Sequence, residues 1–444
     1  MVQALPFRAL RFHSNRVDVE KVVAPARSRI PSASRSALLD ADPRNMAHVV
    51  YAEHEEGDAK KDDDPFGEAP LRRGAALLAD WQRAGLLVPD DIPSFYLFRQ
   101  TFTRDEDEDD HGKGESTSRY GVFVCLDLDA DAVANILPHE KILENRALGV
   151  EHQREILRVL VEPVFLTYRD EKRKVHRAVR SYFEEEPDLV FDFDDVMSEM
   201  WIIDDETTCA RIQAHLDETA LYIADGHHRM ASFARELEHK KSAGEENPKT
   251  QATAFLVAVS EPGLLVRATH RTFSFADEVN VDELLEKLSQ TFVVSHLENP
   301  IHECEELAET LRSAGIAFIL VSKSRQHLLR LEIEPESLFH DEEHQKHYLD
   351  TSIVERVIFQ ALQEKAPNTL MDFDRDLHKV LRDVDHGEGR RLACLVQAPT
   401  LEAIYAISDE GKTVCPKSTA FMPRLPIGIC MAHVSTLKED AQHD

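Results

Sequence analysis

The stretch LYIADGHHRMASFARE, residues 221–236, decides how the middle of the chain folds. It opens with a compact apolar run, which suits a buried strand. Asp225-Gly226 is a turn pair. The apolar residues that follow recur at the spacing of one helix face: Met230, Phe233, Ala234 and Leu237. The pattern therefore predicts a strand, a tight turn and a helix, with Asp225 as the helix N-cap.

The first turn of this predicted helix carries His227, His228 and Arg229. Positive residues there oppose the helix dipole, which already places a partial positive charge at the N-terminus. A bound anion removes the conflict, because free backbone N–H groups, the dipole and Arg229 converge on a phosphate or carboxylate. We therefore expect an anion site, with Gly226 allowing the backbone to approach the ligand closely.

Two other interpretations of these residues stay open. A metal site needs a third ligand from elsewhere, because neighbouring histidines on a helix lie about 100° apart and do not share a face. In the simplest interpretation, Arg229 pairs with nearby carboxylates while His227 and His228 pack or stay solvated. The sequence favours the anion site over both.

Composition limits the classes of function. The 444 residues suffice for about two or three domains. The net charge of −30, from 52 Lys and Arg against 82 Asp and Glu, argues against general binding of nucleic acids or anionic membranes. A small anion can still bind in a locally positive pocket. The six cysteines are scattered without a C-x-x-C, which favours a reducing, cytoplasmic setting over a structural zinc site. The oligomeric state stays open.

The order of the predicted elements indicates a mixed α/β protein. Strands at 94–103 and 119–128 predict a hairpin, and the acidic loop between them, 104–118, is interpreted as a solvated tip rather than a cation site. A second strand pair is predicted at 252–260 and 264–273. Beyond this point helices and strands alternate. We therefore expect one region at 1–275 and a C-terminal α/β region at 276–444.

Two further segments suggest chemistry. In LPHEKILENR (137–146), a carboxylate beside a histidine, Glu140 beside His139, suits a general base or a magnesium ligand. In CPKSTAFMPR (415–424), a lysine precedes two hydroxyl residues, as in a phosphate-binding P-loop: Lys417, Ser418 and Thr419. The upstream glycines of a P-loop are missing. The simpler interpretations are a charged helix start and a hydroxyl-stabilised turn.

Two histidine-containing segments are weaker candidates. Arg271, next to His270 at the end of a predicted strand, would add a positive group to a pocket. His340, His344 and His347 share one helix face at a spacing that a transition metal accepts, although the flanking charges favour a solvated helix. The motifs of serine hydrolases, zincins, dinucleotide-binding folds and protein kinases do not occur in the chain.

The segment YIADGHHRMASFA (222–234) resembles the signature of an uncharacterised family, number one thousand and fifteen among the domains of unknown function. Five further segments resemble that family in the same order: 6–12, 42–53, 136–170, 269–273 and 414–434. Two positions depart from it. VVAPARSRIPSA (22–33) stands where the family usually has a Pro-Pro-Tyr-Asp-Val-like segment, and Met230 stands where it often has Tyr.

The Asp-Gly-His-His-Arg element also resembles the phosphate-binding turn of the ParB-like/sulfiredoxin superfamily. Members of that superfamily bind nucleotides, and some are free-serine kinases or nucleotide hydrolases. Sulfiredoxin chemistry needs a cysteine beside the His-Arg pair, and none is present here. The resemblance implies a ParB/sulfiredoxin-like core and the handling of ATP or ADP, or else CTP, with Mg²⁺.

From these observations we expect a nucleotide-dependent phosphotransferase or hydrolase that acts on a small metabolite, with serine or phosphoserine as candidates. The expected catalytic residues are Glu140, Asp225, His228 and Lys417, with Glu140 and Asp225 also as metal ligands. The expected nucleotide-binding residues are His139, Gly226, His227, His228, Arg229, Arg271, Ser418 and Thr419. The alternatives are a non-catalytic nucleotide-binding switch and a metal-dependent hydrolase.

Overall fold

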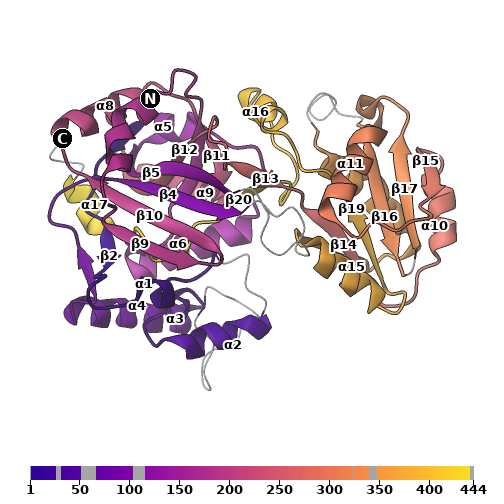
Figure 1. Ribbon diagram of the computed structural model, residues 1–444, viewed down its shortest axis with the longest axis horizontal. Helices are drawn as coiled ribbons and strands as arrows, with labels where there is room; N and C mark the ends of the chain where they lie inside the picture. The colour runs from indigo at the N-terminus through magenta and orange to yellow at the C-terminus, as the bar shows by residue number, and fades with distance from the viewer. Residues whose placement is uncertain are drawn as a thin grey trace.

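The computed structural model of the protein describes residues 2–26, 32–51, 67–103, 116–323, 325–339 and 348–440. Two lobes lie side by side, the first built on a nine-stranded sheet and the second on a six-stranded sheet (Figure 1). The predicted class, mixed α/β with a C-terminal α/β region, is confirmed. The acidic loop at 104–115 and the histidine segment at 340–347 lie outside the described residues.

The first-lobe sheet has the order β6-β11-β8-β12-β5-β4-β10-β9, and β1 pairs with β5. The pairs β11–β6 and β12–β8 are parallel and the others antiparallel, so the sheet is mixed. Its strands are β1 (Gln3–Leu5), β4 (Phe95–Thr103), β5 (Ser116–Leu128), β6 (Ile136–Leu137), β8 (Val164–Tyr168), β9 (Leu189–Phe193), β10 (Val196–Ile203), β11 (Leu221–Asp225) and β12 (Thr250–Ala258).

Helices and short strand pairs complete the first lobe. The long helices α6 and α9 pack against each other beside the sheet. The helices are α1 (Val19–Val22), α2 (Ser32–Ala41), α3 (Ala47–Val50), α4 (Glu68–Arg83), α5 (Ala130–Ala134), α6 (Glu144–Leu157), α7 (Lys174–Val179), α8 (Glu206–Leu216), α9 (His227–Ser242) and α16 (Leu401–Asp409). Two short strands, β2 (Leu10–Phe12) and β3 (Leu87–Pro89), pair antiparallel.

The end of the chain returns to the first lobe. β20 (Ala420–Met422) pairs with β13 (Leu265–Arg267), and β21 (Ala432–His433) pairs with β7 (Val159–Leu160). α17 (Val434–Asp440) packs on β12. The fully buried Arg119 side chain of β5 donates hydrogen bonds to the carbonyl oxygens of Met422 and Pro423. These contacts make the C-terminal segment part of the first lobe's core.

The second lobe is an antiparallel sheet with helices on it. Its strand order is β15-β17-β16-β19-β14-β18. The strands are β14 (His270–Ser274), β15 (Phe292–His296), β16 (Ala317–Ser322), β17 (Arg325–Leu331), β18 (Leu370–Asp374) and β19 (Arg391–Leu395). The helices are α10 (Val281–Leu288), α11 (Cys304–Ala314), α13 (Asp350–Ile353), α14 (Gln360–Lys365) and α15 (Leu377–Asp385). In the described part of the chain, no helix is long and apolar enough to cross a bilayer.

Several sequence predictions can be compared with these elements. The strand, turn and helix at 221–236 and the hairpin of β4 and β5 are confirmed. The second predicted strand pair is wrong, because 264–273 divides into β13 in the first lobe and β14 in the second. Asp225 is not the N-cap of α9: Gly226 takes that position with a left-handed backbone. The boundary near residue 275 stays a prediction.

Candidate functional site

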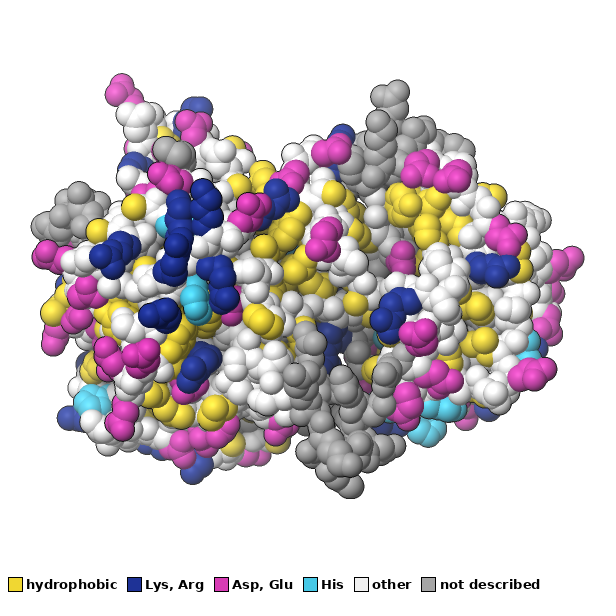
Figure 2. Space-filling model, turned by 45° about the horizontal axis from the view of Figure 1, so that its top comes forward, with side chains coloured by type: hydrophobic (Ala, Val, Ile, Leu, Met, Phe, Trp, Pro, Cys, Tyr) yellow, Lys and Arg dark blue, Asp and Glu magenta, His cyan; other side chains and the backbone are white. Residues whose placement is uncertain are grey.

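A cleft of about 1910 Å³ runs between the two lobes. Nine basic residues line it: Arg146, Arg154, Arg229, Arg267, Arg312, Arg375, Lys379, Lys417 and Arg424. Eight acidic residues line it as well: Glu140, Glu162, Asp194, Asp195, Asp225, Asp372, Asp374 and Asp376. The whole chain has far more acids than bases, and acidic side chains are spread over both lobes (Figure 2). The cleft is therefore locally enriched in positive charge.

The first-lobe wall of the cleft contains the junction of β11 and α9. Gly226 joins them with φ of 99°, a conformation that glycine adopts without a steric penalty. A Cβ atom at this position would lie 2.8 Å from Nε of Arg229. No described residue accepts a hydrogen bond from the backbone N–H of His227, His228 or Arg229. Unpaired donors of this kind, together with the helix dipole, are chemically able to bind an anion.

The side chain of Arg229 is paired with carboxylates. Its Nη1 contacts Glu162, and its Nη2 lies 3.4 Å from Oδ2 of Asp225. The guanidinium crosses the face of Gly226 that has no side chain. Arg229 therefore stabilises the turn. The two carboxylates neutralise most of the positive charge that it would otherwise present to the cleft.

Three histidines beside the turn are uncharged at neutral pH. Burial and the neighbouring His227 lower the pKa of His139 to about 3. Burial, followed by the charges of Lys417 and Arg146, lowers the pKa of His228 to about 4, and burial also lowers that of His227. Nε2 of His228 accepts a hydrogen bond from the Leu143 N–H at 3.0 Å, which leaves its proton on Nδ1. Neutral rings relieve the expected conflict with the helix dipole.

Glu140 holds the loop that carries Lys417. Its two carboxylate oxygens accept hydrogen bonds from the Lys417 N–H at 3.1 Å and from the Thr419 N–H and hydroxyl at 2.8 Å each. The Glu140 side chain is 12% exposed. Burial alone would raise its pKa, but the neighbouring histidines and the hydrogen bonds from Thr419 lower it. Its oxygens are thus already occupied within the protein.

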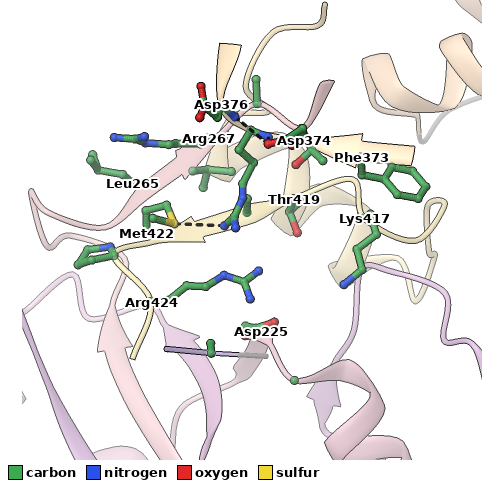
Figure 3. A pocket seen from close by; sticks show the side chains of 18 of the residues that line it. Asp225, Leu265, Arg267, Phe373, Asp374, Asp376, Lys417, Thr419, Met422 and Arg424 are labelled. Carbon is green, nitrogen blue, oxygen red and sulfur yellow. Dashed lines mark hydrogen bonds between the residues drawn. The ribbon is translucent and has the colours of Figure 1, made fainter. Parts of the chain in front are cut away.

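Lys417 reaches into the cleft from that loop. Lys417 and Arg424 extend over the open space beside Asp225 (Figure 3). Lys417 has a left-handed backbone, with φ of 63°, and none of the described residues forms an ion pair with its ammonium group. Burial lowers its pKa. Partial burial alone would raise the pKa of Asp225, but Arg424, Arg229 and Lys417 hold it well below its usual range. Asp225 therefore stays ionised.

Three of the residues expected to bind nucleotide lie behind the cleft wall. His139, Arg271 and Ser418 are fully buried and do not line the cleft. Arg271 donates to the carbonyl oxygens of Thr269 and Lys417 and pairs with Glu355 at 3.2 Å. These residues support the 415–419 loop from beneath. The other expected site residues line the cleft: Glu140, Asp225, Gly226, His227, His228, Arg229, Lys417 and Thr419.

Sequence reasoning missed several cleft residues. Arg146 was noted as one charge of its segment but was given no role, and it lies close enough to lower the pKa of both His228 and Lys417. Arg375 approaches Sδ of Met422 from the second lobe at 3.4 Å, a contact drawn as a dashed line in Figure 3. Arg424 follows β20 within a segment that was selected for its lysine. No local spacing distinguishes such arginines, because the fold brings them together from distant parts of the chain.

Known structures resemble this one at low identity. A conserved hypothetical protein from Pyrococcus furiosus is 16% identical, with coverage of 70% of this chain and 97% of that chain and a TM-score of 0.37. A free serine kinase in complex with AMP is 16% identical, with coverage of 72% and 92% and a TM-score of 0.38. SbnI with a C-terminal truncation, from Staphylococcus aureus, is 10% identical, with coverage of 72% and 93% and a TM-score of 0.37.

The sequence comparison with families is more direct. No curated protein matches the chain. The model described as "Protein of unknown function (DUF1015)" matches residues 4–367, which is most of the chain. The match agrees with the resemblance of the Asp-Gly-His-His-Arg segment and of the segments at 6–12, 42–53, 136–170 and 269–273, whereas 414–434 lies beyond it. The chain therefore belongs to the DUF1015 family.

Proposed function

We propose that the protein is a nucleotide-dependent phosphotransferase or hydrolase that acts on a small metabolite and holds the phosphates at the start of α9. One observation carries the proposal: three backbone N–H groups, those of His227, His228 and Arg229, have no acceptor among the described residues and lie beside the ammonium group of Lys417, which has no ion-pair partner among those residues. A phosphate offers several acceptor oxygens and the negative charge that this arrangement lacks.

The size of the cleft fits two ligands. Pockets for small molecules usually measure about 300–1,000 Å³, whereas this cleft has about 1910 Å³. A nucleotide at the start of α9 leaves room for a second molecule along the same cleft. Water alone would suffice as the second reactant in a hydrolase.

Each residue around the junction has a role in this proposal. Lys417 neutralises charge on the transferring group, as cationic clamps do in phosphoryl transfer. His228 donates from Nδ1 to a phosphate oxygen. Asp225 remains ionised and accepts a hydrogen bond from the attacking hydroxyl. Glu140 positions Lys417 through the hydrogen bonds it accepts from the loop.

A magnesium ion fits only part of this residue set. Mg²⁺ is usually bound by one or two carboxylates together with phosphate oxygens and water. The Asp225 side chain is 40% exposed toward the cleft and meets that need, whereas the oxygens of Glu140 already accept hydrogen bonds. When bound, the ion supplies charge neutralisation. Among the described residues, no group of three or more His, Cys, Asp or Glu is arranged to hold a metal.

Calorimetric titration with ADP, ATP and CTP tests the phosphate site. We expect Lys417→Ala and Arg146→Ala each to weaken nucleotide affinity about tenfold or more, because each removes a charge-assisted contact of about 1.5–3 kcal/mol. Lys323→Ala, at an exposed position in the second lobe, is the matched control and should bind normally. Unchanged affinity in both cleft variants would contradict the phosphate site.

A turnover measurement distinguishes an enzyme from a non-catalytic nucleotide-binding switch. The protein is incubated with ATP, ADP or CTP and with serine or phosphoserine, and the products are separated by chromatography. Transfer of phosphate to the metabolite supports a phosphotransferase, and loss of nucleotide phosphate without an acceptor product supports a hydrolase. Nucleotide binding with no conversion in any combination would overturn the enzymatic proposal and favour the switch.

A further inference from the structure

A second group of polar atoms lies in the cleft away from the start of α9. We call this part the α6–α9 pocket; the six residues that define it are Val150, Gln153, Arg154, Val161, Ser232 and Phe233. They come from α6, from α9 and from the segment after β7. Arg229 connects the pocket to the junction of β11 and α9. The phosphate site proposed above makes no use of Gln153 or Arg154.

Three buried donors at this pocket have no acceptor in the described structure: Nε2 of Gln153, Nη1 of Arg154 and Nε of Arg229. Each such group costs about 1–3 kcal/mol when it is left unpaired. Native proteins leave few of them unpaired, and those few call for a ligand, a water or an ion. All three are donors, so a partner must offer acceptors and no competing donors.

Arg154 is fixed so that one edge of its guanidinium remains available. Its Nη2 lies 2.9 Å from the Glu236 carboxylate and 3.4 Å from the Ser232 carbonyl oxygen. The guanidinium lies 4.4 Å from the centre of the Phe233 ring. Its side chain is only 10% exposed, yet Nη1 has no partner among the described residues. The arginine is thus held in place, and Nη1 is a buried donor that the described residues leave unused.

Ser232 links this arginine to Arg229. The Ser232 hydroxyl donates to the Arg229 carbonyl oxygen at 2.8 Å, and the Ser232 carbonyl oxygen accepts from Arg154. The unpaired donors therefore belong to two packed helices, α6 and α9. A planar group with two acceptor oxygens supplies acceptors for two such donors at once, and it also accepts in the paired fashion that arginine favours.

We propose that the α6–α9 pocket binds the carboxylate of a small organic acid, using Arg154 and Gln153 as donors. A carboxylate has only acceptors, whereas a water molecule would bring donors as well. That this acid is the second substrate rests on the proposed function, because the pocket and the phosphate site share one cleft. The pocket then selects the acceptor by its carboxylate, and the start of α9 holds the phosphate.

The test compares acids with their amides. L-Lactate and L-serine are titrated into the full chain by calorimetry, with and without ADP, beside lactamide and serinamide. The acids should bind at millimolar concentrations, and the amides, which lack the second acceptor oxygen and the charge, should bind at least tenfold more weakly. Equal binding of acids and amides, or no saturable binding of either acid, would overturn the proposal.

Three variants test whether the acids bind in the α6–α9 pocket. Gln153→Leu removes an unpaired donor at similar size, so acid affinity should fall about tenfold while thermal stability is kept or raised. Gln153→Glu places a like charge in the pocket and should abolish acid binding. Arg154→Lys keeps the charge but loses the guanidinium edge and should weaken acid binding. Gln213→Leu in α8, outside the cleft, is the matched control.

The other possible results of these experiments also support or overturn the proposal. Unchanged acid affinity in both Gln153 variants overturns the proposal. Inorganic phosphate that displaces L-lactate with equal affinity would identify a second phosphate site instead. ADP affinity should stay unchanged in Gln153→Leu, because that residue lies outside the start of α9. A failed carboxylate site with normal ADP binding therefore leaves the proposed function standing. Unchanged ADP affinity in both Lys417→Ala and Arg146→Ala refutes that function alone.

Discussion

At the residue scale, the carboxylate oxygens of Glu140 are engaged in hydrogen bonds that hold a loop. Its oxygens accept three hydrogen bonds from Lys417 and Thr419, so a carboxylate predicted to be a base acts as a positioning group. Sequence alone suggested the residue because a carboxylate beside a histidine is a common catalytic pair. Its partners lie about 280 residues away, and no local pattern reveals them. The same holds for Arg229, whose Glu162 partner was not identified.

Replacing Glu140 by glutamine tests this role. In Glu140→Gln the amide NH₂ faces a backbone donor, so we expect a loss of about 2 kcal/mol in the free energy of unfolding and weaker ADP binding, because Lys417 is no longer held. Urea unfolding and calorimetry measure the two effects. Glu144→Gln, whose pair with Arg235 is exposed to solvent and contributes little to stability, is the control. A Glu140→Gln variant as stable as Glu144→Gln would argue against the clamp.

At the element scale, the junction of β11 and α9 was the most predictable part of the site. The apolar run and the helical spacing determine the strand and the helix, so both could be predicted. The N-cap could not, because Asp225 and Gly226 both suit a helix start and only the backbone angle separates them. The pairing predicted for the segment 264–273 was wrong for a similar reason. Its apolar pattern is the same whether the chain stays in one sheet or crosses to another.

The glycine at this junction offers a matched comparison. Gly226 and Gly244 share a left-handed backbone, with φ of 99° and 95°, but only Gly226 faces a close neighbour, Nε of Arg229 at 2.8 Å. Both alanine variants should lose about 1 kcal/mol from backbone strain. Gly226→Ala should lose more, and nucleotide affinity with it, because Arg229 must move. Equal losses in urea unfolding would show that the arginine contact is unimportant.

At the scale of the whole molecule, buried neutral histidines make stability depend on pH. The pKa of His139 is lowered to about 3 and that of His228 to about 4, so the unfolded chain binds protons first as the pH falls below about 6.5. Their contribution to stability is full above pH 6.5 and declines toward the folded pKa values. Glu261 acts in the opposite direction, because burial raises its pKa to about 7 and its contribution is lost as the pH rises toward that value.

A variant isolates the histidine contribution. The free energy of unfolding is measured for the native chain and for His228→Asn. The measurements cover about three pH units, from pH 4.5 to 7.5. The native chain should lose about 1 kcal/mol more than the variant as the pH falls from 7 to 5, after allowance for the partial exposure of the ring. Parallel curves for the two proteins would mean that His228 titrates normally.

The arrangement of the lobes was the least predictable level. Composition and element order gave the class, but they did not show that residues 420–440 rejoin the first lobe, because short strands such as β20 and β21 carry little periodicity. Figure 1 shows this last segment beside strands from the first half of the chain. Lys417 lies on the crossing between the lobes, supported by Glu140 on one side and by Arg271 on the other.

This return of the chain has a consequence for biosynthesis. The second lobe is continuous in sequence from β14 to β19, so it can fold as soon as it leaves the ribosome. The first lobe is translated earlier, yet Arg119 has no carbonyl partners until Met422 and Pro423 emerge. The core of the first lobe therefore stays incomplete until Met422 and Pro423 have been synthesised, and Lys417 takes its place in the cleft wall only at that stage.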